Sequence, residues 1–289
     1  PKETFRLIKS RPVKNLRELS LMFSIPSLRK DYKTKPGEMF SFIMGHEGEG
    51  SLLSFLKQED LATGLSASAD SESDSYGVAY INIELTKKGF ESYHQVIRHV
   101  FEYIKLMKNS HFQDTVFEEE NTMARLNELF SDKGEGAWRA VRLSNEVNTY
   151  PLKDAGRIAY IYGDPDPMAY EAILDALRPD NMLAMLISDQ LDVTQTEPLF
   201  GIKYDYEEDD SFYDELKTVH YNDALYLPKP NPFIPEDTTL LHKKIKEGGI
   251  PKLIKQDEGS ALYYFPDTEF LRPKATLIYK IRFVNQLIF

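Results

Sequence analysis

The residues best suited to metal chemistry in this sequence are six histidines, because the chain has no cysteine. They are His46, His94, His99, His111, His220 and His242. No two of them stand four residues apart, the spacing that turns two imidazoles toward one zinc ion from a single helix face. His99 and Glu102 are three residues apart and could share a metal, but no third ligand is evident. We expect them instead to be two solvated side chains opposite an apolar helix face.

An acidic, glycine-rich segment, Gly-His-Glu-Gly-Glu-Gly, occupies residues 45–50. Glycines ahead of a helix expose backbone N–H groups that can bind phosphate. Glu47 and Glu49 would repel an anion, however, and no Gly-Lys-Ser or Gly-Lys-Thr follows. The segment therefore favours a break between two helices, with Ser51 as the N-cap of the second, or a loop that binds peptide.

The remaining candidates do not assemble into an active site. The chain has no Gly-x-Ser-x-Gly elbow for a nucleophilic serine. The run Glu118-Glu119-Glu120 is typical of the exposed first part of a helix, where negative charge complements the helix dipole. Trp138, the single tryptophan, is predicted to be a packing anchor. A metalloenzyme built on His94, His99 or Glu102 remains a third hypothesis after the two given below.

Composition narrows the classes of partner. Of the 289 residues, 42% are hydrophobic and 28% are charged, as in a globular protein. The net charge of −11 and the lack of a basic stripe disfavour nucleic acid. No apolar run reaches the roughly 18–20 residues that span a bilayer, so we expect no membrane partner. The opening Pro-Lys-Glu-Thr-Phe has neither an initiator Met nor a signal pattern, so we expect the natural N-terminus to lie upstream.

Apolar periodicity predicts the elements that hold these residues. Leu19, Leu21, Phe23 and Ile25 alternate with polar or flexible residues, which predicts the first strand, ended by Pro26. Two helical pieces are predicted within 37–60, and an antiparallel hairpin over 63–85.

Beyond the hairpin, Thr86 is suited to cap a helix of about five turns whose apolar stripe runs from Phe90 to Met107. Further helices are predicted around 114–130, 137–147 and 167–177, followed by a strand over 182–187. This order indicates an α+β fold in which helices cover one face of a largely antiparallel sheet.

A proline-rich connection divides the chain. Residues 227–238 contain four prolines, which favour an extended, semi-rigid connection. We therefore predict a first domain over 1–226, the connection over 227–238, and the start of a second domain over 239–289. Strands are predicted there over 261–265 and 275–284. About 50 residues without a helix make a poor independent core, so we expect the second domain to be truncated.

Distinctive short motifs are spread along nearly the whole chain. They are Ser-Leu-Arg-Lys-Asp-Tyr at 27–32, Lys-Pro-Gly at 35–37, Gly-His-Glu-Gly-Glu-Gly-Ser-Leu-Leu at 45–53, Tyr-Pro-Leu at 150–152, Leu-Arg-Pro-Asp-Asn at 177–181, Phe-Ile-Pro at 233–235 and Phe-Leu-Arg-Pro-Lys-Ala at 270–275. In order and spacing they resemble the pitrilysin and insulin-degrading enzyme family of zinc metallopeptidases. The resemblance implies four homologous modules that form two bowl-like halves around a peptide. This chain resembles the second, inactive module followed by the opening strands of the third.

That resemblance implies a non-catalytic segment that anchors substrates and forms part of the chamber of a peptide-degrading zinc metalloendopeptidase. The alternative is a purely structural module that docks its neighbours without contacting substrate. In the family, the zinc-binding His-x-x-Glu-His lies on the first module, and this chain has no such motif. We therefore expect no catalytic residue, metal ligand or cofactor in this chain, and zinc in the longer parent enzyme.

The resemblance also implies an exosite, where an exposed strand pairs with the amino-terminal residues of a substrate and a nearby loop holds its ammonium group. The residues so implied are Gly64, Leu65, Ser66 and Ala67, continuing to Ser68, on the strand, and Gly45, His46 and Glu47 on the loop. Ala67 and Ser68 replace a glycine pair found in insulin-degrading enzyme, and Phe42 replaces a histidine. Main-chain pairing needs no particular side chain, and a carboxylate can hold an ammonium group.

The expected partners are extended peptides and the catalytic and C-terminal modules of the same polypeptide, with no nucleic acid and no membrane. Bacterial relatives implied by the resemblance are periplasmic and others are cytosolic. A periplasmic location is therefore slightly favoured over a cytoplasmic one.

Overall fold

The computed structural model describes residues 2–131, 136–235, 237–239, 250–265 and 275–281. The chain divides into two compact units, Pro1–Pro232 and Phe233–Phe289. The boundary between the two units in the sequence falls within the predicted connection 227–238, whose described residues contain no helix or strand. No helix of the described residues has the length and apolar character needed to cross a membrane.

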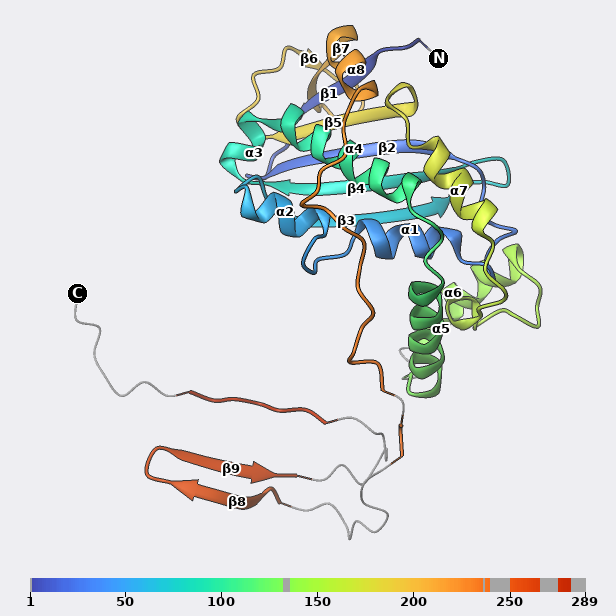
Figure 1. The fold of residues 1–289 in the computed structure, drawn as a ribbon, viewed down its shortest axis with the longest axis vertical. Helices are drawn as coiled ribbons and strands as arrows, with labels where there is room; N and C mark the ends of the chain where they lie inside the picture. Colours follow the sequence, from blue (N-terminus) through green and yellow to red (C-terminus); the bar gives the residue numbers. More distant parts are fainter. Residues whose placement is uncertain (1, 132–135, 236, 240–249, 266–274, 282–289) are drawn as a thin grey trace. The chain divides into compact units, whose positions relative to one another are not determined.

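A seven-stranded sheet runs through the first unit (Figure 1). Its strands are β1 (Phe5–Arg11), β2 (Arg17–Ile25), β3 (Ala62–Ser71), β4 (Gly77–Leu85), β5 (Met182–Ser188), β6 (Gln195–Thr196) and β7 (Lys203–Asp209). Their order across the sheet is β3-β4-β2-β5-β1-β7-β6. Only β1 and β5 pair in parallel, and the other neighbours are antiparallel. The predicted α+β fold with a largely antiparallel sheet is confirmed.

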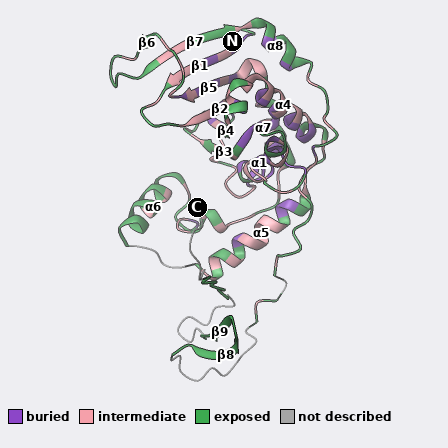
Figure 2. Ribbon diagram, turned by 90° about the vertical axis from the view of Figure 1, so that its left-hand side faces the viewer, coloured by how far each residue is buried: buried purple, intermediate pink, exposed green. Residues whose placement is uncertain are grey.

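Helices cover one face of this sheet. They are α1 (Pro36–Met44), α2 (Leu52–Gln58), α3 (Lys87–Glu91), α4 (Tyr93–Asn109), α7 (Pro167–Ala176) and α8 (Asp210–Lys217). Helices α5 (Asp114–Leu129) and α6 (Gly136–Thr149) extend beyond the strands (Figure 1), and short 3-10 turns lie at Ile158–Tyr160 and Pro179–Asn181. Figure 2 shows buried residues concentrated where α1, α4 and α7 meet the strands.

Strict alternation along the central strands builds the core. On β2, Leu19, Leu21 and Phe23 are fully buried, and on β4 Ile81 and Ile83 are equally buried. Side chains on a strand point alternately to its two faces, so these residues all face the helices. The predicted stripe along α4 supplies their partners, and its Ile97, Val100, Phe101 and Ile104 are all buried in the same cluster.

Two predicted helix caps are confirmed by hydrogen bonds. The Ser51 side chain accepts a bond from Ser54 N at the start of α2, and Thr86 accepts one from Gly89 N at the start of α3. The helix expected to run from Phe90 to Met107 is interrupted, however. It divides at Ser92 into α3 and α4, and Phe90 belongs to the shorter piece.

The strand at 19–25 was expected to be the first, and this is wrong, because β1 precedes it. Sequence reasoning also missed β6, β7 and α8. Strand β1 has only Phe5 and Leu7 as buried apolar residues, and β7 has none, so neither shows a long apolar alternation. The pairing of β1 with β5 and β7, and of β7 with β6, comes from tertiary contacts, which local propensity does not encode.

The second unit contains one described hairpin, β8 (Lys252–Asp257) and β9 (Ser260–Tyr264). Strand β9 corresponds to the strand predicted over 261–265, whereas β8 was missed. Residues 275–281 form no strand, contrary to the prediction for 275–284, and residues 282–284 lie outside the described part. Every residue of the hairpin is exposed, so a hydrophobic core does not determine its structure here.

The contact between α3 and the start of β3 gives a test of the fold. A Cβ on Gly89 would lie 1.9 Å from Leu61 O, which also accepts a bond from Thr86 N, so Gly89→Ala must displace backbone. We expect it to lower the free energy of unfolding by about 2 kcal/mol. The control is Gly136→Ala, whose Cβ would meet nothing within 4 Å and should leave stability unchanged or raise it by up to ~1 kcal/mol. Urea unfolding measures both, and equal losses would contradict this packing.

Candidate functional site

Strand β3 lies at the edge of the sheet and, within the described residues, pairs with β4 on one side only. Its pairing shifts register between Ala62 and Gly64 and then continues regularly to Ser71. Leu65 is buried, while Ala67 and Ala69 are half-buried and pack against the core. An edge strand of this kind presents backbone donors and acceptors that another chain can pair with.

The glycine-rich loop and helix α1 lie against this strand. A Cβ on Gly45 would lie 3.7 Å from Ala67 N, and a Cβ on Gly37 would lie 2.7 Å from Ala69 O. The main chain of α1 and its following loop therefore approaches the β3 main chain at both ends of the helix (Figure 1). The loop and strand implied by the family resemblance are thus neighbours in space.

The loop is held in place by the chain that leads to the proline-rich connection. Gly50 has a φ of +80°, and a side chain there would collide with the Tyr226 ring at 2.4 Å. Tyr226 N donates a hydrogen bond to Gly50 O at 3.0 Å. Lys229 Nζ lies 3.7 Å from Glu49 Oε2 and 4.9 Å from the centre of the Tyr226 ring. Of the two interpretations of residues 45–50, a break between helices is confirmed, and a peptide-binding role is compatible with it.

The His46 ring lies beside Gly48 and Phe42. Its Nε2 lies 2.5 Å from where a Cβ on Gly48 would be, and its centre is 5.8 Å from that of the Phe42 ring. Burial lowers the pKa of His46, and the carboxylate of Glu47 partly opposes this. Glu47 itself is exposed, and its ion pair with Lys57 is long, at 3.9 Å.

A hollow of about 320 Å³ connects Glu47 with the start of the edge strand. Its lining residues are Glu18, Glu47, Gly64, Leu65, Ser66, Asn82, Ile83 and Glu84. Four of the implied site residues therefore come together here, namely Glu47, Gly64, Leu65 and Ser66. Gly45 and Ala67 meet at the strand edge beside it, and His46 is not part of the lining.

Sequence reasoning missed Glu18, Asn82 and Glu84 as members of this hollow. They come from β2 and β4, and the pairing places Glu18 opposite Glu84 and Ser20 opposite Asn82. The Ser20 hydroxyl donates to Asn82 Oδ1 at 2.6 Å. The signal that could have found them is the strand register, which the hairpin over 63–85 specifies for β4 but not for β2.

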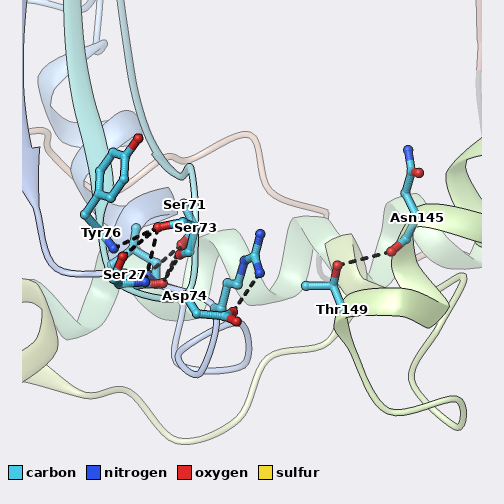
Figure 3. A network of polar contacts seen from close by, with 10 residues as sticks. Ser27, Ser71, Ser73, Asp74, Tyr76, Asn145 and Thr149 are labelled. Atoms are coloured by element: carbon cyan, nitrogen blue, oxygen red, sulfur yellow. Dashed lines mark hydrogen bonds and ion pairs between the residues drawn. The ribbon is translucent and has the colours of Figure 1, made fainter.

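A second cavity, of about 340 Å³, lies at the far end of β3, between Ala69–Ser71 and α6. Figure 3 shows the polar groups around it, with Ser27, Ser71 and Ser73 pointing toward one another and Asn145 and Thr149 on α6. Leu28 N donates to Ser71 Oγ at 2.6 Å, and Arg29 pairs with Asp74 at the same distance. These bonds stabilise the turn between β3 and β4.

The prediction that His99 and Glu102 are two solvated side chains is wrong. His99 Nδ1 donates to Glu102 Oε2 at 2.8 Å, and the two side chains are only 13% and 20% exposed. Asn222 Nδ2 donates to the same oxygen at 2.9 Å. Burial raises the pKa of Glu102, but the hydrogen bonds from His99 and Asn222 outweigh it and hold the pKa below its ordinary value. The loop around Asn222 removes this polar face of α4 from solvent.

No metal site is evident in the part of the chain that the structure describes, because no three His, Asp or Glu side chains converge. His94 stacks on Phe212, with ring centres 4.1 Å apart, and packs against Phe5. His99 Nδ1 and the Glu102 carboxylate are hydrogen-bonded to each other rather than directed at a common metal position. These residues therefore do not fit the zinc ion that the family resemblance implies for the parent enzyme.

Two further expectations are wrong. Of the run 118–120, only Glu118 is exposed. Glu119 accepts a bond from Asn231 N at 2.9 Å, and burial, with Glu38 and Glu119 nearby, raises the pKa of Glu120. Trp138 is 72% exposed and does not anchor packing among the residues that the structure describes, because α6 buries none of its residues there.

Comparison with known proteins gives consistent matches along the whole chain. Residues 1–124 match the family model described as the peptidase M16 inactive domain, and residues 129–286 match the middle or third domain of peptidase M16. The putative zinc protease mug138 of Schizosaccharomyces pombe is 30% identical, with 99% of this chain and 30% of that protein covered. Human insulin-degrading enzyme is 30% identical over 94% of this chain and 27% of its own length.

Two further relatives extend these matches. The A-factor-processing enzyme of Saccharomyces cerevisiae is 31% identical over 95% of this chain and 27% of its own length. The crystal structure of pitrilysin superposes with a TM-score of 0.78 at 22% identity, covering 92% of this chain and 28% of pitrilysin, which supports the same fold. The chain thus spans less than a third of the length of these relatives. Because one family model alone matches more than half of it, this chain belongs to the M16 peptidase family, of which it carries the inactive domain and middle-domain sequence.

Proposed function

We propose that this chain anchors extended peptides for a longer zinc peptidase by pairing their main chain with the edge of β3. The observation that supports this most directly is the edge strand itself, which has one sheet neighbour and lies beside the loop of Gly45 and Glu47. Peptides commonly bind by adding a strand to such an edge, since main-chain hydrogen bonds supply affinity for many sequences.

The replacement of the family's glycine pair is compatible with this role. Ala67 directs its small side chain into packing with the core. Its N–H lies beside Gly45, where a glycine leaves room for close backbone approach. The main-chain groups that a peptide would use are therefore not blocked by the side chain of Ala67.

The charge of the loop suits the amino terminus of a peptide. Burial favours neutral His46, while Glu47 and Glu49 are exposed carboxylates. The loop is therefore negative at neutral pH, and its charge can attract an ammonium group. Hydrolysis and zinc binding would come from another part of the longer protein, because the described residues offer no fitting metal ligands.

A second candidate role is docking of neighbouring modules. Helix α6 is supported by Tyr150, whose ring lies 4.9 Å from that of Tyr32, yet Trp138 and Val141 are 72% and 53% exposed. Exposed apolar groups gathered on one helix are typical of a protein contact. This role is compatible with peptide anchoring at the start of β3, because α6 borders only the far end of that strand, at Ala69–Ser71.

Strand addition can be tested without altering the protein. A fluorescent ten-residue extended peptide should bind the 289-residue chain, and fluorescence anisotropy should show the affinity fall about tenfold or more when alternate peptide nitrogens are methylated, because those N–H groups are lost. Methylation of the other alternate set should have a smaller effect, because those groups point away from β3. Equal binding of all three peptides would contradict pairing at an edge.

The role of the loop carboxylate calls for a matched pair of variants. Glu47→Gln should weaken binding of a peptide with a free amino terminus by about threefold to tenfold and leave its N-acetylated form unaffected. Glu49→Gln removes the same charge from the same loop, but the Glu49 carboxylate is paired with Lys229. This variant should therefore have little effect on binding of either peptide. If the two variants behave alike toward both peptides, Glu47 has no anchoring role.

Titration of His46 tests the local electrostatics. Its pKa, followed by NMR, should lie below 6.5, and Glu47→Gln should lower it further because the carboxylate favours the imidazolium. Since folding favours the neutral form, the stabilising contribution of this group is present above pH 6.5 and decreases as the pH falls through that value. An unchanged pKa in Glu47→Gln would show that the loop has a different arrangement in solution.

A further inference from the structure

The open face of the sheet carries a row of three residues that leads to the strand edge. In register, Glu18 on β2 lies opposite Glu84 on β4, and Glu84 lies opposite Gly64 on β3. Leu19 and Ile83, their neighbours along the strands, are buried under the helices. Because side chains alternate between faces, Glu18 and Glu84 both stand on the face away from the helices.

Gly64 leaves the end of this row open toward the edge. A Cβ on Gly64 would lie 3.0 Å from Glu84 Oε2 and 3.1 Å from Glu84 Cδ, so the carboxylate of Glu84 extends over the glycine. Thr63 Oγ1, at 3.3 Å, contacts the same oxygen. The carboxylate is therefore directed along the row toward the position that a peptide paired with β3 would occupy.

The carboxylates of this row have no cationic partner among the residues that the structure describes. No ion pair involves Glu18 or Glu84, and Glu47, which lines the same hollow, has only the long contact to Lys57. Like charges directly opposite each other on neighbouring strands destabilise a sheet. A cation brought to this position would relieve that repulsion and gain two or three carboxylate partners.

We infer that the peptides anchored at β3 are basic ones, with a Lys or Arg side chain opposite Gly64 that binds Glu84 and Glu18 on the open face. This inference rests on the proposed function, because the strand edge supplies the site and the carboxylates supply only its selectivity. Neighbouring strands are about 4.8 Å apart, so the added residue and Glu84 are separated by roughly 10 Å between their Cα atoms. The long stem of Lys or Arg and the side chain of Glu84 together cover that span, and no side chain on Gly64 intervenes.

The surroundings suit a long cationic side chain. Leu65 and Ile83 also line the hollow, but their side chains are buried under the helices, so only their main chain borders the stem. Asn82 and Ser66, also in the lining, add neutral polar groups. An anionic side chain at the same position would face the carboxylates across the hollow, so the site is expected to select against acidic peptides as well.

The test compares peptides that differ only in charge. A neutral ten-residue extended peptide, labelled at its C-terminus, is titrated beside versions in which Lys replaces Gln at one position at a time. One position should show affinity about fivefold to tenfold higher for Lys, and this gain should shrink as salt is raised. The double variant Glu18→Gln with Glu84→Gln should abolish the gain, so that the Lys and Gln peptides bind it with equal affinity.

The control is the double variant Glu171→Gln with Glu258→Gln, which removes the same net charge from exposed positions outside the hollow. It should retain the preference for Lys. Thermal unfolding should show that the Glu18 and Glu84 variant is folded and no less stable than the parent chain, because a like-charge contact has been removed.

The outcomes separate the two proposals. If the neutral peptide binds and loses affinity on N-methylation, but Lys gives no gain at any position, the selectivity is overturned and strand addition stands. A gain that survives in the Glu18 and Glu84 variant also overturns it. If no peptide binds at all, both proposals fail.

Discussion

Side chains along β2 and β4 alternate between the two faces of the sheet, and both the core and the candidate site depend on this alternation. Because Leu19, Leu21 and Phe23 are buried beneath α4, the face of β2 that is turned toward the helices is fixed. A slip of one residue would exchange the buried set for the exposed one, at a cost of several apolar side chains moved into water. The same alternation places Glu18 and Glu84 on the open face and brings their carboxylates beside the edge strand.

Much of the fold follows from local patterns, and the parts that do not have identifiable causes. Strong alternation over 19–25 and the stripe of α4 were sufficient to predict their elements, and Ser51 and Thr86 were correctly identified as caps. Strand β1 was missed because its apolar alternation is short, and its parallel pairing with β5 joins residues about 180 positions apart. Such a pairing depends on tertiary contacts that no local window contains.

The candidate site likewise contains residues that the sequence could identify and residues that it could not. The loop at 45–50 and the strand at 64–68 carry distinctive residues, and the structure places them side by side. Glu18 and Glu84 could not be identified, because they become neighbours of Gly64 only through cross-strand register. The pair His99 and Glu102 shows the complementary difficulty: helical periodicity correctly places it on the polar face of α4, yet Asn222, 120 positions away, desolvates it. Polarity of a helix face therefore does not establish its exposure.

The contact between Tyr226 and Gly50 couples the loop to the exit of the first unit. Tyr226 directly precedes the proline-rich connection, and it touches the loop through both its main chain and its ring. The segment that borders the edge of β3 is therefore also packed against the chain that leaves the first unit. A change in the path of the chain at Tyr226 would have to be accommodated at Gly50, where φ is positive and the Tyr226 ring leaves no room for a side chain.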